Sequence, residues 1–211
     1  MTMLIPNRIL LLPLILLFAT ACQAQQVGEV VRLDGQAHVT HASGETVALA
    51  AGDPVFVQDT LQTAEQSVLV IRMVDQSRLT LGENTRVEVS RYRTSGEPEA
   101  LITITRGRLG AFVSDFFSSR SESFKVKTTR ALAGVRGTEL IVIADPEQTR
   151  MIVMKGEGVV YSSDPAIVDR IILRDRQSTI IREGHSPTPP TAVDTSLLKE
   201  IGLSGEEGSQ K

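Results

Sequence analysis

Short apolar runs separated by turn-forming residues recur along the chain from residue 27 to residue 183, and this spacing restricts the fold more than any other feature. Runs of this kind, bounded by Gly, Asp, Asn or Ser, are typical of β-strands. The segment 124–128 alternates apolar and polar residues, whereas 140–143 is continuously apolar, as expected of a strand covered on both faces. We predict an all-β body of many short strands, arranged as a sandwich or a short solenoid.

Individual strands can be predicted from these runs, which recur roughly every 8 to 15 residues. Aromatic residues make up 4% of the chain and Trp is absent, so Val, Ile and Leu must fill the core. After residue 66 the expected strands are Ser67–Met73, Arg78–Leu81, Arg86–Tyr92, Leu101–Thr105, Arg108–Val113, Phe124–Thr128, Glu139–Ala144, Met151–Lys155, Val159–Ser162, Arg170–Leu173 and Ser178–Arg182.

The first strands of the body are predicted to form hairpins. Asp34-Gly35 separates two alternating runs, and an Asp-Gly pair in this position is a strong signal for a two-residue hairpin turn. Ser43-Gly44 marks a second turn before the run 45–49. Alternation then directs one set of side chains into the core: Val31, Leu33, Ala37, Val39, Val47 and Leu49.

Residues 1–24 are predicted to be a secretory signal peptide. Arg8 is the only charge before the apolar run 9–18, and small residues follow at 19–21. A permanent membrane anchor is the weaker alternative, because the run is too short to span the hydrocarbon core and Pro13 interrupts it. No second apolar run of spanning length follows. We therefore expect an exported protein without a transmembrane span in its mature form.

Cys22 leaves two processing outcomes open. The sequence 18–22, Phe-Ala-Thr-Ala-Cys, resembles the lipobox in which bacterial lipoproteins acylate their cysteine, although Ala19 stands where Leu is usual. Lipid on Cys22 would hold the protein at a membrane. Cleavage after Ala24 would instead remove the cysteine together with the signal peptide.

The strand pattern stops after Glu183. Residues 184–191 contain three prolines and are expected to form a stiff, extended linker. Asp194 is a candidate cap for a short C-terminal helix ending at Ile201, and we expect 205–211 to be disordered.

Catalytic, metal and cofactor sites are not indicated by the composition. One Cys and three His exclude a Cys/His zinc framework, and no nucleophile motif is present. We expect all three histidines on the solvated surface. The segment 134–138, Gly-Val-Arg-Gly-Thr, has two glycines but lacks the lysine and spacing of a phosphate-binding loop, so we interpret it as a tight connection into a strand. The chain is therefore predicted not to be an enzyme and to hold no cofactor.

Two segments carry a family resemblance. Residues 52–85, with Asp59, Thr63 and Asp75, and residues 124–140 resemble the FecR domain in order and spacing. The run Ala-Gly-Val-Arg-Gly-Thr-Glu at 133–139 is the most specific part, and the resemblance covers about 55–155. Gln58, Ala64 and Gln76 stand at turn positions where the family usually has glycine.

The resemblance implies an all-β periplasmic domain of a Gram-negative bacterium and marks residues of structural importance. These are Asp59, Thr63, Asp75, Gly134, Arg136, Gly137, Thr138 and Glu139. From its place between two glycines we expect Arg136 to be a buried organiser that pairs with a carboxylate, so that its removal costs several kcal/mol. Gly137 is expected to need a positive φ angle.

The FecR family regulators pass a signal from an outer-membrane transporter to a sigma factor, but only eight residues precede the apolar run here. We therefore expect a stand-alone envelope module whose partner is an unidentified envelope protein, bound through an exposed sheet edge. The second hypothesis is an anionic envelope glycan, because residues 72–136 hold 12 Lys and Arg against seven Asp and Glu. Solvated strand faces are the favoured explanation of these charges. Nucleic acid is not expected, and an envelope hydrolase is a remote third alternative.

Overall fold

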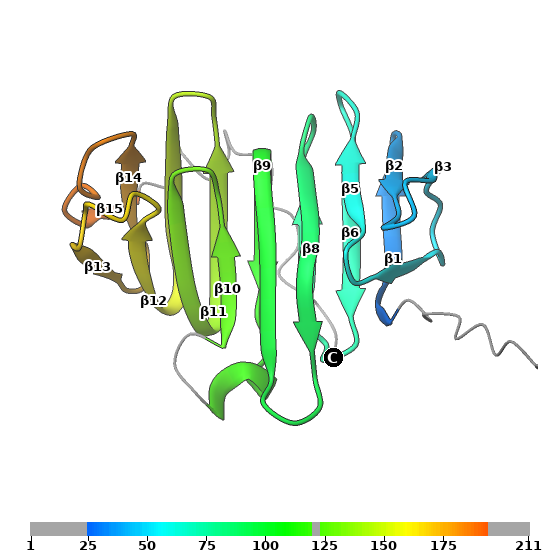
Figure 1. The fold of residues 1–211 in the computed structure, drawn as a ribbon, viewed down its shortest axis with the longest axis horizontal. Coiled ribbons are helices and arrows are strands. Elements are labelled where there is room, and N and C mark those ends of the chain that lie inside the picture. The colour runs from blue at the N-terminus through cyan, green and yellow to red at the C-terminus, as the bar shows by residue number, and fades with distance from the viewer. Residues whose placement is uncertain (1–24, 120–122, 194–211) are drawn as a thin grey trace, which may run out of the picture.

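The computed structural model describes residues 25–119 and 123–193, and these form one continuous mixed β-sheet (Figure 1). The all-β prediction is confirmed. The predicted signal peptide with Cys22, the predicted C-terminal helix and the predicted disordered tail lie outside the described residues. The strands are β1 Gln26–Asp34, β2 Ala37–Thr40, β3 Thr46–Ala48, β4 Pro54–Phe56, β5 Thr60–Thr63, β6 Val68–Met73, β7 Arg78–Leu81, β8 Arg86–Arg93, β9 Glu99–Phe112, β10 Phe124–Lys127, β11 Ala131–Ala144, β12 Gln148–Ser162, β13 Arg170–Leu173, β14 Gln177–Arg182 and β15 Thr191–Ala192.

Three long strands, β9, β11 and β12, connect two layers of this sheet. The first half of β9 pairs with β8 and, in parallel, with β10, whereas its second half pairs with β7 and β11. In the same way β12 pairs with β13 through its C-terminal part and with β14 through its N-terminal part. The front layer therefore runs β3-β2-β5-β8-β9-β10-β11-β12-β13, and the back layer runs β4-β1-β6-β7-β9-β11-β12-β14-β15 (Figure 1).

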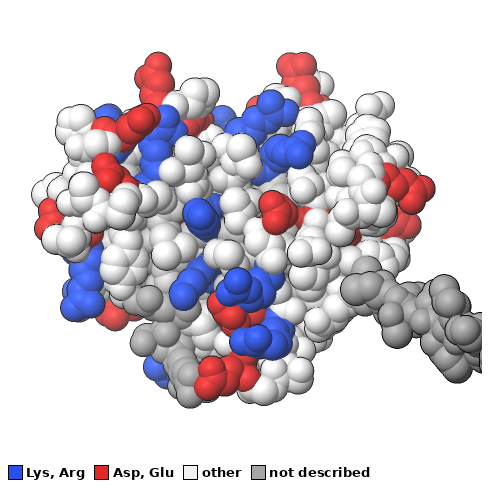
Figure 2. All heavy atoms as spheres, viewed as in Figure 1, with Lys and Arg blue, Asp and Glu red and all other residues white. Residues whose placement is uncertain are grey.

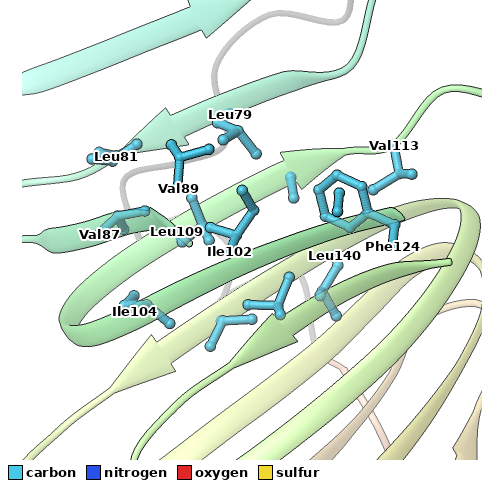
Figure 3. Close-up of a cluster of buried hydrophobic side chains, with 14 of the residues drawn as sticks. Leu79, Leu81, Val87, Val89, Ile102, Ile104, Leu109, Val113, Phe124 and Leu140 are labelled. Carbon is cyan, nitrogen blue, oxygen red and sulfur yellow. The ribbon is translucent and has the colours of Figure 1, made fainter. Parts of the chain in front are cut away.

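The core lies between these layers and is built almost entirely from aliphatic side chains. Ile102 and Ile104 from the first half of β9 face Leu109 from its second half, beside Leu79 of β7 and Leu140 of β11 (Figure 3). All five are fully buried. Three aromatic rings, those of Tyr92, Phe117 and Phe124, pack edge to face at one end of this core.

The turn of β9 from one layer to the other depends on Gly107 and Thr85. Gly107 has a φ of +92°, and a Cβ atom there would lie 2.5 Å from the Cα of Thr85. The Thr85 hydroxyl accepts the N–H of Arg108 and lies 3.2 Å from its C=O, which also accepts the N–H of Gly82. Thr85 therefore ties the bend of β9 to the turn between β7 and β8. Only glycine combines this φ angle with so close a backbone approach.

Several predicted turns, inward-facing residues and strand ends are wrong, because the strands are divided between two layers. Asp34-Gly35 does not form a hairpin: β1 pairs with β4 and β6, β2 pairs with β3 and β5, and the chain crosses between layers at Gly35. A register shift between Val30 and Arg32 reverses the alternation, which leaves Val31 38% exposed. Val47 is also exposed, because β3 lies at an edge.

Strands predicted separately at 101–105 and 108–113 are the single strand β9, and β12 unites 151–155 with 159–162.

A second, smaller apolar cluster lies outside the main core. It consists of Ile141, Ile152 and Val193, with Ile143 and Met154 packed against it. Within the described residues, no helix is long and apolar enough to cross a membrane. The only helical element in this part of the chain is the 3-10 turn η1 at Asp115–Ser119.

Candidate binding surface

Asp59 is a buried carboxylate that organises the turn between β4 and β5. Its Oδ2 accepts the N–H of Phe56 at 2.8 Å, and its Oδ1 lies 2.7 Å from Nδ1 of His41. Asp59 is 1% exposed and the His41 side chain 26%. The surface position expected for all three histidines is therefore wrong for His41, whereas His38 and His185 are exposed.

Asp75 is the centre of a second polar network, in the turn between β6 and β7. Its Oδ1 accepts the hydroxyl of Tyr92 at 2.5 Å, and its Oδ2 accepts the hydroxyls of Ser77 and Ser114. One side chain thus joins the turn to β8 and to the chain just beyond β9. Burial, and secondarily the charge of Asp75, raise the pKa of the Tyr92 phenol well above its usual range.

Thr63 and Thr138 hold backbone that strand pairing leaves unsatisfied. The hydroxyl of Thr63 donates to the C=O of Gly82 and accepts the N–H of Thr85, which fixes the turn between β7 and β8. The hydroxyl of Thr138 lies within hydrogen-bond distance of the C=O of Arg136 and of Glu157, across the bend shared by β11 and β12. Both threonines are buried and act as structural ties.

The glycine-rich segment of β11 places its residues alternately inside and outside the front layer. Gly137 has a φ of +53°, as predicted, and Gly134 lies in the ladder opposite Lys125 and Val159. Arg136 is exposed, and so is Glu139. The expected burial of Arg136 is wrong, because Val135 points into the core and its neighbour must then point out. No ion pair joins Arg136 to any described residue.

These outward residues belong to a wider surface, the outer face of the front layer from β8 to β13. Two cross-strand rows follow from the register. One runs Arg91, Leu101, Lys125, Gly134, Val159 and Ile172; the other runs Glu88, Thr103, Lys127, Leu132, Tyr161 and Arg170. The face therefore mixes half-buried apolar side chains with cations at strand spacing.

Part of the positive charge on this face is unpaired. Arg91 and Arg93 both contact Glu99, at 2.5 and 3.4 Å. Lys125, Lys127 and Arg136 make no ion pair or hydrogen bond through their side chains within the described part of the chain. Figure 2 shows Lys and Arg side chains gathered over the middle of this layer, with a few acidic side chains among them.

At one end of the face, β13 is an open edge. It pairs with β12, and no other strand within 25–119 and 123–193 pairs with its outer side. Val168, just before this strand, is 89% exposed, and Ile172, within it, is 39% exposed. The other edge strands are better protected: β4 begins with Pro54, β15 has two residues and follows Pro189 and Pro190, and β3 has three residues.

A metal centre is not apparent on this surface. The described residues contain no group of three His, Cys, Asp or Glu side chains able to hold an ion. His41 directly follows β2 and Asp59 directly precedes β5, and both strands belong to the part of the front layer that is remote from β13. The surface offers backbone edge, apolar contact and positive charge, which are means of recognition rather than of bond chemistry.

Sequence reasoning missed the apolar end of this surface. The strand at 170–173 was predicted, yet an edge position cannot be read from a strand's own residues, because it depends on which strands pair elsewhere. The available signal was Val168, an apolar residue between charged Asp169 and the turn at Asp164-Pro165. His41 was missed because Asp59, its partner, is 18 residues away.

The described residues thus form an all-β fold with an open sheet edge at β13, beside an outer face that carries unpaired cations. Residues 59–157 match the family model described as FecR protein, so this part of the chain is a FecR domain, as the signature segments predicted. No curated protein matches the chain.

Among solved structures, two of a protein described as an anti-sigma factor from Parabacteroides distasonis, at 1.65 and 2.50 Å resolution, are similar. Each matches with a TM-score of 0.52 and 17% identity over 66% of this chain. The match spans 62% of the length of that protein and shows a shared fold. A structure described as a cell surface anchoring domain matches 30% of this chain at 30% identity, with a TM-score of 0.30.

Proposed function

We propose that this protein is a non-enzymatic module of the bacterial cell envelope that binds a protein partner by strand addition at β13. The open edge of β13 carries this proposal. An added strand would pair with its free backbone groups, and side chains on alternate positions would contact Ile172 and the outer face beyond it. The FecR domain and its fold relationship to an anti-sigma protein support a role in signalling.

The export signal predicted for residues 1–24 is the basis for placing the protein in the periplasm of a Gram-negative organism, where Cys22 would determine membrane attachment. A partner there would be an envelope protein that presents an extended segment. Acidic residues in that segment are expected, because Arg170 of β13 and Lys127 of β10 lie in one cross-strand row of the same face.

The test is photo-crosslinking in intact cells with a photoreactive residue at position 172. Defined protein adducts are expected there, and not with the same residue at position 74, where Val74 is 50% exposed on the turn after β6. Adducts at both positions in equal yield, or no protein adduct at 172, would contradict strand addition.

An anionic glycan is the second candidate, favoured by the unpaired Lys125, Lys127 and Arg136. Reversing two charges, Lys125→Glu with Lys127→Glu, should abolish retention on peptidoglycan or lipopolysaccharide if glycan binding is the function. Ile172→Lys should leave that retention intact and remove the protein adducts. The two variants therefore separate the candidates.

A further inference from the structure

The outer face of the back layer carries an apolar band, formed by Ile141 and Ile143 of β11 with Ile152 and Met154 of β12. Register places Ile141 between Ile152 and Gly110 of β9 in one cross-strand row. The residues that alternate with the band belong to the main core: Leu140, Val142, Met151 and Val153. The band therefore faces away from that core, on the outside of the sheet.

Val193 packs against this apolar band. It forms one buried cluster with Ile141 and Ile152, in which Ile152 is 0% exposed and the other two residues are 7% exposed. The N–H of Val193 donates to the C=O of Arg176 at 2.9 Å, and the preceding strand β15 pairs with β14. The chain is thus held at the sheet edge up to Val193, whose side chain turns onto the outer face.

The sequence after Val193 is suited to continue over this face. Asp194 is a typical helix N-cap residue, and Leu197, Leu198 and Ile201 would share one stripe of a helix that begins there. In such a helix Val193 precedes the cap and Leu198 is the fourth residue after it. Apolar residues at these two positions often pack together as a hydrophobic staple. Because Val193 lies on the apolar band, the staple would bring Leu198 to the same place.

The dimensions of this segment match the band. A helix over 194–201 would be about 12 Å long, at about 1.5 Å per residue. Neighbouring strands lie about 4.8 Å apart, so the helix would cross about two or three of them. From Ile152 on β12 it would reach over β11 to β9, where Gly110 adds no side chain to the row and leaves room for a close approach.

Charge favours this segment over a second copy of the sheet face. Residues 194–211 hold four Asp or Glu against two Lys. In the neighbouring cross-strand row, Ile143 lies between Arg108 of β9 and Arg150 of β12, and all three are half-buried. Two such faces packed together would bring arginines near arginines, whereas the acidic segment brings opposite charge.

We propose that residues 194–201 form a short helix that docks on the apolar band. Its stripe of leucine and isoleucine contacts Ile141, Ile143 and Met154, and the staple from Val193 fixes where the helix starts. The band belongs to the back layer and β13 to the front layer, so this contact and strand addition at β13 stand or fall separately.

The test is methyl NMR of the purified mature protein with its Ile, Leu and Met methyl groups labelled. Nuclear Overhauser contacts are expected between Leu198 and Ile141, and between Ile201 and the rest of the apolar band. Leu198→Gln should lower the docked population about tenfold or more relative to the undocked one, because the burial of a leucine side chain is lost. The methyl shifts of Ile141, Ile143 and Met154 should move with it.

Lys199→Gln is the matched control. It introduces the same residue one position further on, on the opposite side of the proposed helix, and should leave the contacts and the methyl shifts unchanged. Equal changes in Leu198→Gln and Lys199→Gln would contradict a helix docked through its apolar stripe. No contact between 197–201 and the apolar band in the labelled protein would overturn the proposal outright.

A mixture of two labelled samples separates this occupant from a second copy. One sample is labelled only at Leu and the other only at Ile and Met. Contacts between Leu198 and the apolar band should vanish in the mixture, because both partners then never occur labelled in one chain. Contacts that persist would place the segment of a second copy on the band, and this result would also contradict the proposal.

Discussion

The two segments that resemble the FecR signature use their polar residues differently. In the first, 52–85, the side chains of Asp59, Thr63 and Asp75 turn inward and hold neighbouring turns together. In the second, 124–140, Thr138 turns inward, whereas Lys125, Lys127 and Arg136 lie on the outer face. These three polar residues of the first segment are structural, whereas the second segment is structural on one side and carries exposed cations on the other.

This difference follows from strand position. In the first segment Asp59, Thr63 and Asp75 lie in turns or at the ends of strands, and a turn's backbone needs side-chain partners. The second segment lies in β10 and β11, which sit in the middle of the front layer, so every second residue must face solvent. A shared sequence motif therefore does not give its residues a shared role.

The largest effect should come from the bend that the first segment supports. Gly107→Ala should lower the free energy of unfolding by at least about 3 kcal/mol, because its Cβ would overlap Thr85 at a positive φ. Gly44→Ala is the control: φ is +89° there, but no atom lies within 4 Å of the added Cβ. Urea unfolding should show a distinctly smaller loss for Gly44→Ala; equal losses would mean that Thr85 does not restrict the bend.

The next largest loss of stability is expected from Thr138, which faces inward in the second segment. Thr138→Val removes the hydroxyl that bonds the C=O of Arg136 and of Glu157, and should cost about 1–3 kcal/mol in urea unfolding. Thr138→Ser keeps the hydroxyl and should lose less. An unchanged unfolding midpoint for Thr138→Val would place this threonine with the surface residues instead.

The buried phenol of Tyr92, which contacts Asp75 of the first segment, gives a pH-dependent effect. The pKa of Tyr92 is raised in the folded protein, so the unfolded chain loses this proton first and stability falls as pH rises above about 10. The fall from this one group should approach about 1.4 kcal/mol per pH unit. In Tyr92→Phe the free energy of unfolding should fall less steeply with pH above about 10, by that amount. An identical slope in the two proteins would show that the folded structure does not keep the phenol protonated.

A small gain is expected where the first segment departs from the family. Gln76 has a φ of +71° and Gln58 one of +69°, at two of the turn positions where the family usually has glycine. Gln76→Gly should relieve backbone strain and raise the free energy of unfolding by roughly 0.5–1 kcal/mol after its own entropic cost. A lower thermal midpoint for Gln76→Gly would show that the Gln76 side chain stabilises the turn more than its φ strains it.

Much of the fold could be predicted because strand alternation is local. The strands at Arg78–Leu81 and Arg170–Leu173 were predicted with the observed ends, and that at Ser67–Met73 within one residue. The continuity of β9 and of β12 could not be predicted, because a glycine that bends a strand between layers looks the same in sequence as a glycine in a turn. The hairpin turn predicted at Asp34-Gly35 is wrong for this reason, because the chain crosses between the layers there.

The buried polar networks and the outer surface were predicted less well, because they depend on contacts between distant residues. Asp75 meets Ser114 across 39 positions, and no local pattern indicates this pair. The outward direction of Arg136 could have been predicted, because Ala133 and Val135 alternate with it in one strand and are buried. The glycines on either side of Arg136 do not determine the direction of its side chain, which follows from strand alternation.

The most direct test of this division of roles is urea unfolding of Asp75→Ala beside Arg136→Ala. Asp75→Ala leaves the buried Tyr92 hydroxyl without its acceptor and should cost about 2–3 kcal/mol. Arg136→Ala removes an exposed, unpaired side chain and should change the free energy of unfolding by less than about 0.5 kcal/mol. A loss of several kcal/mol for Arg136→Ala, or none for Asp75→Ala, would contradict the assignment of the first segment to scaffold and of Arg136 to the binding surface.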